Sequence, residues 1–268
     1  LRASYGLVGN NRISAYSYMQ TVTVTQGGSF NNQLVNTLSF SSANPDIEWE
    51  KTAMADVGID LGLLRNNLNI TFDWFYNRTY DILFGLPVPG IFGNGAPTQN
   101  AGVVDTSGWE FSFSYLFKTG PVNHHVSGNV SDSWNKVVDI KGTRQINGTD
   151  VTTILMEGYP MNSYYAYKTD GFFQNEAECA AGPVPDGITV KPGDIRYVDK
   201  TGEGRINSDD RFVLGNDFPR YLFSLTYGFE VKGFDFSMMW QGVGKRSKWM
   251  RGEAVEAFHN NNEGPVLD

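Results

Sequence analysis

The residues with the clearest capacity for chemistry form one run from Asp199 to Asp210. Oxygen-bearing side chains occupy its first, third, fifth and twelfth positions, a glycine occupies the sixth, and a backbone carbonyl is available at the seventh. This spacing is that of a loop that surrounds Ca²⁺ with oxygen ligands. The candidate ligands are Asp199, Thr201, Glu203, Arg205 through its carbonyl, and Asp210. The alternative is a pair of polar turns at Gly202 and Gly204 that holds no ion.

Aromatic side chains supply a second candidate site. Tyr164, Tyr165 and Tyr167 lie in a segment rich in tyrosine and phenylalanine, residues 159–173. Open aromatic rings stack on sugars and peptides, so these tyrosines are candidate substrate contacts; the alternative is that they pack against lipid or neighbouring loops. His124 and His125 are adjacent on an expected strand, which directs their rings to opposite faces and prevents a shared metal site. No nucleophile with a partner base is identifiable, so we expect no enzyme.

The elements that position these residues are strands with one apolar and one polar face. In residues 109–117 every odd position is a large aromatic residue, and the even positions begin Glu110, Ser112, Ser114. Period-two alternation indicates a β-strand, and it recurs in residues 57–63, 70–76, 126–130, 221–229 and 234–240. Short polar turns at 65–67, 119–121 and 231–233 predict hairpins, whereas residues 26–48, 81–108 and 136–210 are expected to be long loops.

The polar faces distinguish a soluble sandwich from a membrane barrel. They consist mainly of Gly, Ser, Thr, Asn and Asp, with few of the Lys and Glu that a soluble sheet exposes to water, and the chain has 18 Phe, 13 Tyr and 6 Trp. This composition is typical of a barrel with an apolar lipid face and a polar lumen. The sequence predicts an all-β fold, an antiparallel transmembrane β-barrel; a soluble secreted β-sheet carbohydrate-binding module is the alternative.

Charge and cysteine content exclude other classes. The net charge of −8 and the absence of a basic cluster argue against a nucleic-acid partner. The single cysteine, Cys179, excludes an intramolecular disulfide. The polar tail and the first residues, which lack an initiator Met, give the expectation that the chain is an internal or processed piece.

Several ordered stretches together resemble the SusC/RagA family of TonB-dependent outer-membrane transporters, in its C-terminal barrel region. They are residues 44–52, 58–63, 73–83, 158–173, 192–199 and 215–244. Residues 103–110, Val-Val-Asp-Thr-Ser-Gly-Trp-Glu, follow the family pattern only loosely. The similarity is spread over most of residues 1–245 and is far more specific than any single short motif.

The resemblance implies part of a 22-stranded barrel that encloses a plug. Residues 1–268 would then be a partial C-terminal region of the barrel domain, with the plug and the terminal strands outside this chain. The long loops 81–108 and 136–210 would form the extracellular surface. The implied location is the outer membrane of a Gram-negative bacterium, in contact with its lipid. The implied partners are a SusD-like surface lipoprotein, the TonB complex through a region outside this chain, and an oligosaccharide or peptide substrate.

Overall fold

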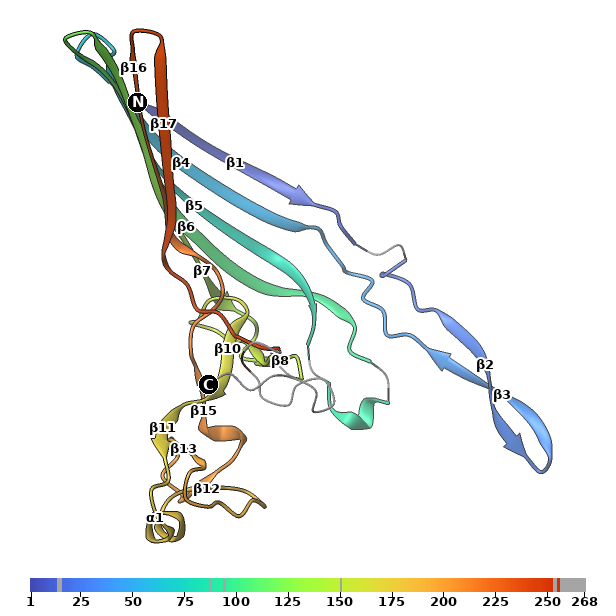
Figure 1. The fold of residues 1–268 in the computed structure, drawn as a ribbon. Helices are drawn as coiled ribbons and strands as arrows, with labels where there is room; N and C mark the ends of the chain where they lie inside the picture. The colour runs from blue at the N-terminus through green and yellow to red at the C-terminus, as the bar shows by residue number, and fades with distance from the viewer. Residues whose placement is uncertain (14–15, 87, 94, 150, 253–254, 256–268) are drawn as a thin grey trace. The chain divides into compact units, whose positions relative to one another are not determined.

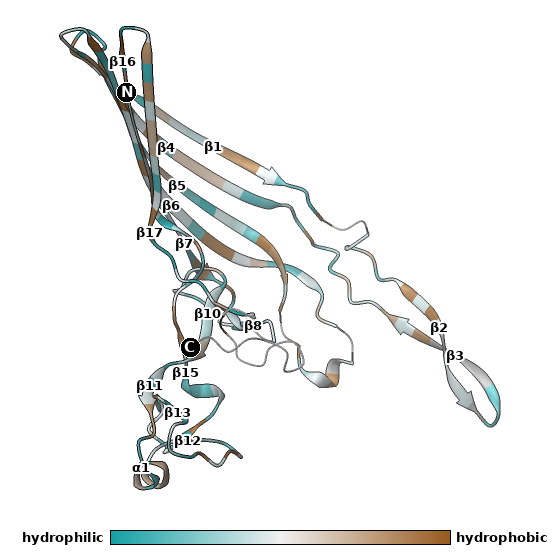
Figure 2. Ribbon diagram, in the orientation of Figure 1, coloured by the Kyte–Doolittle hydropathy of each residue, from teal (hydrophilic) through white to brown (hydrophobic). Residues whose placement is uncertain are grey.

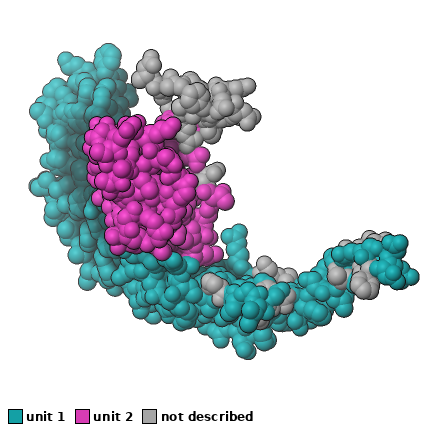
Figure 3. All heavy atoms as spheres, turned by 90° about the horizontal axis from the view of Figure 1, so that it is seen from below, with its two compact units in different colours: residues 1–144, 156–160, 219–245 teal, residues 145–155, 161–218, 246–268 magenta. Residues whose placement is uncertain are grey.

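A computed structural model describes residues 1–13, 16–86, 88–93, 95–149, 151–252 and 255. The chain divides into two compact units, which Figure 3 colours separately. Unit 1 comprises residues 1–144, 156–160 and 219–245, and unit 2 comprises residues 145–155, 161–218 and 246–268. The division differs from the expectation of a single barrel region with two loops, because the second excursion has a core of its own.

Unit 1 is built on a seven-stranded sheet in the order β1-β4-β5-β6-β7-β16-β17 (Figure 1). Its strands are β1 (Arg2–Asn10), β4 (Glu50–Leu63), β5 (Leu68–Gly85), β6 (Thr98–Thr119), β7 (Val122–Asp139), β16 (Arg220–Val231) and β17 (Phe234–Lys245). Every neighbouring pair is antiparallel. The all-β prediction is confirmed, and β1 and β17 are the open edges of this sheet.

Short turns connect the strands at one end of the sheet, as the sequence predicts. Leu64, Arg65 and Asn66 adopt positive φ angles of 52°, 59° and 66° between β4 and β5. Gly120 has φ 60° between β6 and β7, and Lys232 and Gly233 have φ 49° and 85° between β16 and β17. Two consecutive positive φ values match the right-handed twist of the flanking strands, so the last turn closes a tight hairpin.

The expected loops at the other end are partly wrong. A hairpin of β2 (Val22–Phe30) and β3 (Gln33–Phe40) replaces most of the predicted loop 26–48. Within the predicted loop 81–108, β5 continues to Gly85 and β6 begins at Thr98, with a short 3₁₀ helix, Gly90–Phe92, between them; residues 87 and 94 lie outside the described residues. The prediction failed at these edges because glycines such as Gly102 accommodate neighbouring side chains within the sheet and do not end the strand.

The predicted loop 136–210 is also wrong in extent. β7 continues to Asp139, and most of the segment up to Phe218 forms unit 2. Its elements are β8 (Gln145–Asn147), β9 (Thr153–Leu155), β10 (Ser163–Tyr167), β11 (Thr169–Phe172), α1 (Glu176–Ala181), β12 (Val184–Pro185), β13 (Ile195–Tyr197), β14 (Arg205–Ile206), the 3₁₀ helix Ser208–Asp210 and β15 (Arg211–Val213). Buried Ile154, Phe173 and Ile206 contribute to its core.

Among the described residues, none of the helices combines the length and the apolar character that a membrane-spanning helix needs.

Cross-strand pairing of glycine with a ring recurs in unit 1. Phe75 pairs with Gly108, Phe113 with Gly128, His125 with Gly228 and Phe223 with Gly242. In each pair a Cβ built on the glycine would lie within 3.0 Å of the partner ring. The glycines thus let large rings lie flat across the neighbouring strand, which explains the high glycine content without breaking the strands.

Replacement of Gly128 tests this arrangement. Its Cβ would lie 2.8 Å from Cε1 of Phe113 and 3.1 Å from the Ser224 carbonyl oxygen, so Gly128→Ala must displace the ring. We expect the full-length protein to lose about 1–3 kcal/mol of unfolding free energy, measured by urea titration in lipid vesicles. Gly6→Ala is the matched control, because nothing lies within 4 Å of its added Cβ. Equal effects of the two substitutions would contradict the packing role.

Candidate functional site

From the short turns up to the register shifts near the long connections, the strand register assigns the residues of the sheet to two faces. Directly paired residues share a face, and Ala3, Val57, Trp74, Trp109 and Asp132 form one row across five strands. One residue along, the opposite face carries the row Arg2, Gly58, Asp73, Glu110 and Ser131. The first face, called here the outer face, collects the large apolar residues; the second, called the inner face, collects polar ones.

Between the short turns and the row of Trp74 and Trp109, the outer face carries no Asp, Glu, Lys or Arg in the described strands, and the row itself carries one charged residue, Asp132. Hydropathy alternates along the strands as this assignment requires (Figure 2). Within unit 1 these apolar side chains are not enclosed: Val57 is 44% exposed, Trp74 42% and Leu225 40%. A sandwich core would bury such residues, so the sheet presents its apolar face outward.

A belt of stacked rings crosses the outer face near the short turns. The rings of Phe117 and His124 are 4.6 Å apart, and His124 Nδ1 lies 3.0 Å from the Tyr227 hydroxyl. Phe229 and Phe236 continue the belt with centroids 5.4 Å apart. His125 lies on the inner face against Gly228, so the prediction that the two histidines diverge is confirmed. Aromatic belts of this kind mark the boundary between hydrocarbon and water.

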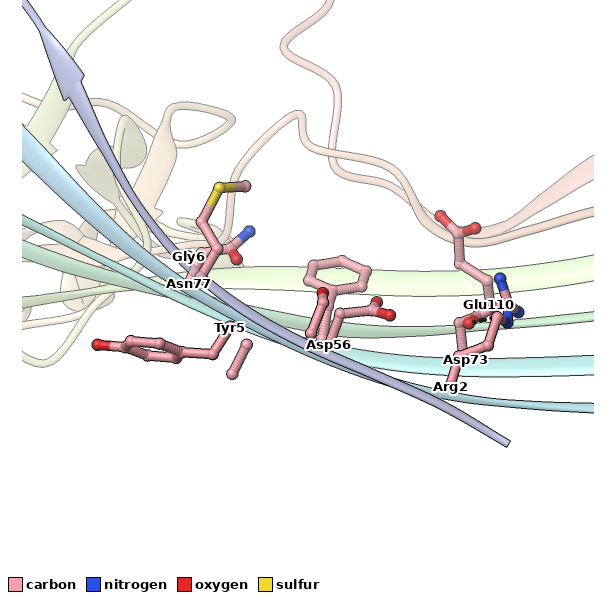
Figure 4. A pocket seen from close by; sticks show the side chains of 11 residues that line it. Arg2, Tyr5, Gly6, Asp56, Asp73, Asn77 and Glu110 are labelled. Atoms are coloured by element: carbon pink, nitrogen blue, oxygen red, sulfur yellow. Dashed lines mark hydrogen bonds and ion pairs between the residues drawn. The ribbon is translucent and has the colours of Figure 1, made fainter.

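The inner face forms a hollow over β1, β4, β5 and β6. It has a volume of about 710 Å³, and its lining includes Arg2, Asp56, Asp73 and Glu110. Figure 4 shows these four side chains on one side of the sheet, whereas Tyr5 projects to the other. The floor is partly apolar, with Met54 and Phe75, and the remainder is polar. An arrangement of this kind can bind a polar chain without covalent chemistry.

Arg2 organises the charges of the hollow. Its Nη2 atom donates to both carboxylate oxygens of Asp73, at 2.9 and 3.0 Å, and its Nε atom lies 2.9 Å from Asp60. Asp56 and Glu110 make no ion pair with any described residue. The lining thus holds one cation and three carboxylates, which leaves the hollow negative and favours neutral or cationic ligands over anionic ones.

The predicted calcium ligands lie together in unit 2, but backbone amides occupy their carboxylate oxygens. Asp199 accepts from the amides of Gly202 and Gly204, at 2.6 and 2.7 Å. Asp210, fully buried, accepts from the amides of Lys200, Thr201 and Asn207 and from the Thr201 hydroxyl. No group of three or more His, Cys, Asp or Glu side chains in the described residues is placed to hold a metal ion. As placed, the residues do not fit Ca²⁺, and calcium binding stays a prediction that requires the loop to rearrange.

The remaining members of the loop stabilise its fold. The side-chain amide of Asn207 donates to Glu203, and Arg205 forms a weak ion pair with Glu203 at 3.3 Å. Asn207 and Asp210 form a capping box at the 3₁₀ helix that follows. The glycines have φ 76° and 77°, which permits both turns. The geometry therefore matches the ion-free alternative of two polar turns around a buried carboxylate.

The three candidate tyrosines differ in accessibility. Tyr164 and Tyr165 are 9% and 5% exposed, which argues against their use as open stacking platforms. Tyr164 packs on Trp249, with ring centroids 5.7 Å apart. Tyr167 is half-buried between the Tyr197 ring and the Arg211 guanidinium, at 5.5 and 5.3 Å. Burial gives the first two a structural role, while substrate contact at Tyr167 stays a prediction.

The inner hollow was not identified from the sequence. Arg2 and Asp73 are 71 residues apart, and only the strand register brings them together. A usable signal did exist, because Asp56, Asp73 and Glu110 each occupy polar-face positions of alternating strands. Converting that signal into a site required the order of the strands.

Replacement of the buried carboxylate tests the role of the turn loop. Hydrogen bonds hold the pKa of Asp210 below its ordinary value despite burial. The strongest contribution comes from the backbone N–H of Asn207, and those of Thr201 and Lys200 add to it. We expect Asp210→Asn to cost about 1–3 kcal/mol of local stability, because its amide group would face N–H donors. Hydrogen exchange of the Lys200, Thr201 and Asn207 amides in the full-length protein measures this. Asp209→Asn, with an exposed side chain, is the control.

The same carboxylate gives a direction to the pH dependence. A pKa lowered by folding contributes stability above the unfolded pKa, about 3.9, and this contribution is lost as pH falls through the folded pKa. Protection of these three amides should therefore fall below about pH 4 in the native protein. The fall should be smaller in Asp210→Asn, and an equal fall in both proteins would contradict the assignment.

Known proteins match the chain along most of its length. The family model "TonB dependent receptor-like, beta-barrel" matches residues 1–262. TonB-dependent receptor P3 of Formosa agariphila is 28% identical over 259 residues, covering 90% of this chain and 25% of that protein. TonB-dependent receptor SusC of Bacteroides thetaiotaomicron is 25% identical over 256 residues, covering 88% and 24%. The chain thus spans about a quarter of the length of these relatives.

A solved structure shares the fold. The RagAB peptide importer in the "open-open" state superposes with a TM-score of 0.68 at 23% identity, covering 90% of this chain and 25% of that one. The family match, the SusC relative and this fold agree with the arrangement of the faces described above. The chain therefore belongs to the family of TonB-dependent receptor-like β-barrels.

Proposed function

We propose that this chain is part of the wall of an importer in the outer membrane of a Gram-negative bacterium. The importer takes up oligomeric nutrients with a SusD-like surface lipoprotein and with energy transmitted by TonB through a region outside this chain. The observation that supports this is the outer face: six neighbouring strands, β4 to β7, β16 and β17, present uncharged side chains between the short turns and the row of Trp74 and Trp109. No covalent chemistry is part of the proposal.

The height of the uncharged band fits a bilayer. On β6 it runs from Phe117 to Trp109, eight residue steps, or about 26 Å along the strand at about 3.3 Å per residue. At a tilt of about 40° this is about 20 Å along the membrane normal, close to the apolar band of outer-membrane barrels, about 25 Å tall. The end with short turns then faces the periplasm, and the long connections face outward.

The charge of the inner face restricts the class of substrate that the importer can take up. The RagAB structures are of a peptide importer, and the SusC/RagA resemblance leaves both oligosaccharides and oligopeptides as substrate classes. Asp56 and Glu110, which have no cationic partner among the described residues, would attract cationic segments and repel anionic ones. We infer that the cargo is a neutral or cationic oligomer, for which short polar wall residues supply hydrogen bonds.

Growth of a strain that lacks the complete gene tests the importer. With oligopeptides or malto-oligosaccharides as the nutrient, we expect the deletion to impair growth on one class of oligomer and not on its monomers. Removal of TonB function should produce the same growth defect, because TonB transmits the energy for uptake in this proposal. Unimpaired growth on both neutral and cationic members of both oligomer classes would contradict the proposal.

Two arginine substitutions on one strand test the orientation of the faces. Leu225 pairs with Gly128 in the middle of the outer face, and Thr226 lies next to it on the inner face. We expect Leu225→Arg to cost about 2–4 kcal/mol in lipid vesicles, because the charge would face hydrocarbon, and Thr226→Arg to cost much less. Urea unfolding of the full-length protein in vesicles measures both. A larger loss for Thr226→Arg would reverse the assignment of the faces.

A further inference from the structure

The charged residues that do occur on the outer face of unit 1 lie toward the long connections. In the row of Trp74 and Trp109, which contains Asp132, and beyond that row, three neighbouring strands and the start of β16 bring six side chains together. This set, called here the rim cluster, comprises Arg78, Asp105, Asp132, Trp134, Lys136 and Arg220. Because the uncharged band ends where the cluster begins, the cluster lies at the level of lipid headgroups if the band spans the hydrocarbon.

The carboxylates of the rim cluster are already engaged by arginines. Arg78 Nε and Nη2 donate to the two oxygens of Asp105 at 2.7 and 2.8 Å, a bidentate pair. Arg220 makes a bidentate pair with Asp132, whose side chain is 2% exposed. Each pair is internally neutral. Its arginine is held in place by the pairing, and Arg78 keeps its Nη1 donors outside this pair.

Lys136 carries the surplus charge. It is the direct cross-strand neighbour of Asp105, is exposed, and makes no ion pair within the described chain. Trp134, two positions along the same face, lies under the Arg220 guanidinium at 5.1 Å. The cluster therefore combines three cations with two carboxylates and an indole, a net charge of +1. Lys136 shares the Asp105 carboxylate with Arg78, so the cluster as a whole attracts a further anionic group, and tryptophan is favoured at the same level.

We propose that the rim cluster binds the phosphate of a lipid headgroup in the leaflet on the side of the long connections. Lys136 supplies the attracting point charge, Arg78 its remaining guanidinium donors, and Trp134 the amphipathic ring at the interface. The paired carboxylates hold the arginines in place and lower the net charge of the cluster. The cluster therefore does not bind every anion by charge alone. The inference rests on the membrane placement of the proposed function, and not on the identity of the cargo.

The test uses the full-length protein in detergent and native mass spectrometry. Short-chain phosphatidylglycerol is the anionic probe and phosphatidylcholine the zwitterionic one. We expect tighter binding of phosphatidylglycerol to the native protein, and a loss of about fivefold in its affinity in Lys136→Gln. Lys136→Arg should retain binding. Lys118→Gln is the matched control, because Lys118 is exposed on the inner face near the short turns.

The outcomes separate lipid from other sources of phosphate. Two results together support the site. Lys136→Gln lowers the affinity for phosphatidylglycerol and Lys118→Gln does not, and the bound lipid is displaced by other lipid but not by millimolar inorganic phosphate. Equal affinities of Lys136→Gln and Lys118→Gln would overturn it, as would full displacement of the lipid by inorganic phosphate. If the native protein binds lipid with this selectivity but the gene deletion impairs growth on no oligomer, the importer proposal is contradicted and the lipid site is still supported.

Discussion

The structure depends on the alternation of side chains across hydrogen-bonded strands. Antiparallel pairing satisfies the backbone polar groups between neighbours, so the side chains alone decide what each face of the sheet can contact. Between the short turns and the row of Trp74 and Trp109 the register has no shift, so neighbouring strands keep a single phase of alternation there; the shifts at Thr79/Ile82 and Val103/Val104 lie toward the long connections. A slip of one residue in any pair would move its apolar set to the inner face. The uncharged outer face and the polar inner face are two results of the same constraint.

Glycine reconciles this alternation with bulky residues. On the inner face Gly108 accommodates Phe75, and on the outer face Gly128 accommodates Phe113. A β-branched residue would strengthen an isolated strand but would push these rings out of the sheet. Glycine weakens the strand locally, but it allows the contact with the aromatic ring on the neighbouring strand. This contact explains why glycine occurs inside long strands.

The sequence was sufficient for the strands whose alternation is strong and for the turns that join them. Residues 109–117 and 221–229 were predicted as strands because aromatic and polar residues alternate without interruption, and the turn at Lys232 and Gly233 has a local signature. Strand ends at the long connections were not predictable in the same way. There β5 and β6 continue through glycine-containing segments because a neighbouring strand pairs with them, a long-range property that local composition does not record.

The site residues show the same division. The spacing of Asp199 to Asp210 predicted an ion, because it orders oxygen atoms along the chain but does not show which donors reach them. The structure shows amides of the same loop in that role. Conversely, Arg2 and Asp73 have no motif, since their proximity comes from the order of β1, β4 and β5. Local spacing thus did not show which donors reach the oxygens of the first site, and it gave no signal for the second.

The length of the central strands has a further consequence. β6 spans 22 residues, whereas a tilted strand needs only about 9–11 to cross hydrocarbon. The surplus of about 11 residues corresponds to about 36 Å of additional pleated ladder beyond the band. Under the proposed membrane placement, this ladder holds the outermost segments of unit 1 above the lipid headgroups, so a macromolecule that arrives from outside reaches them without first displacing lipid.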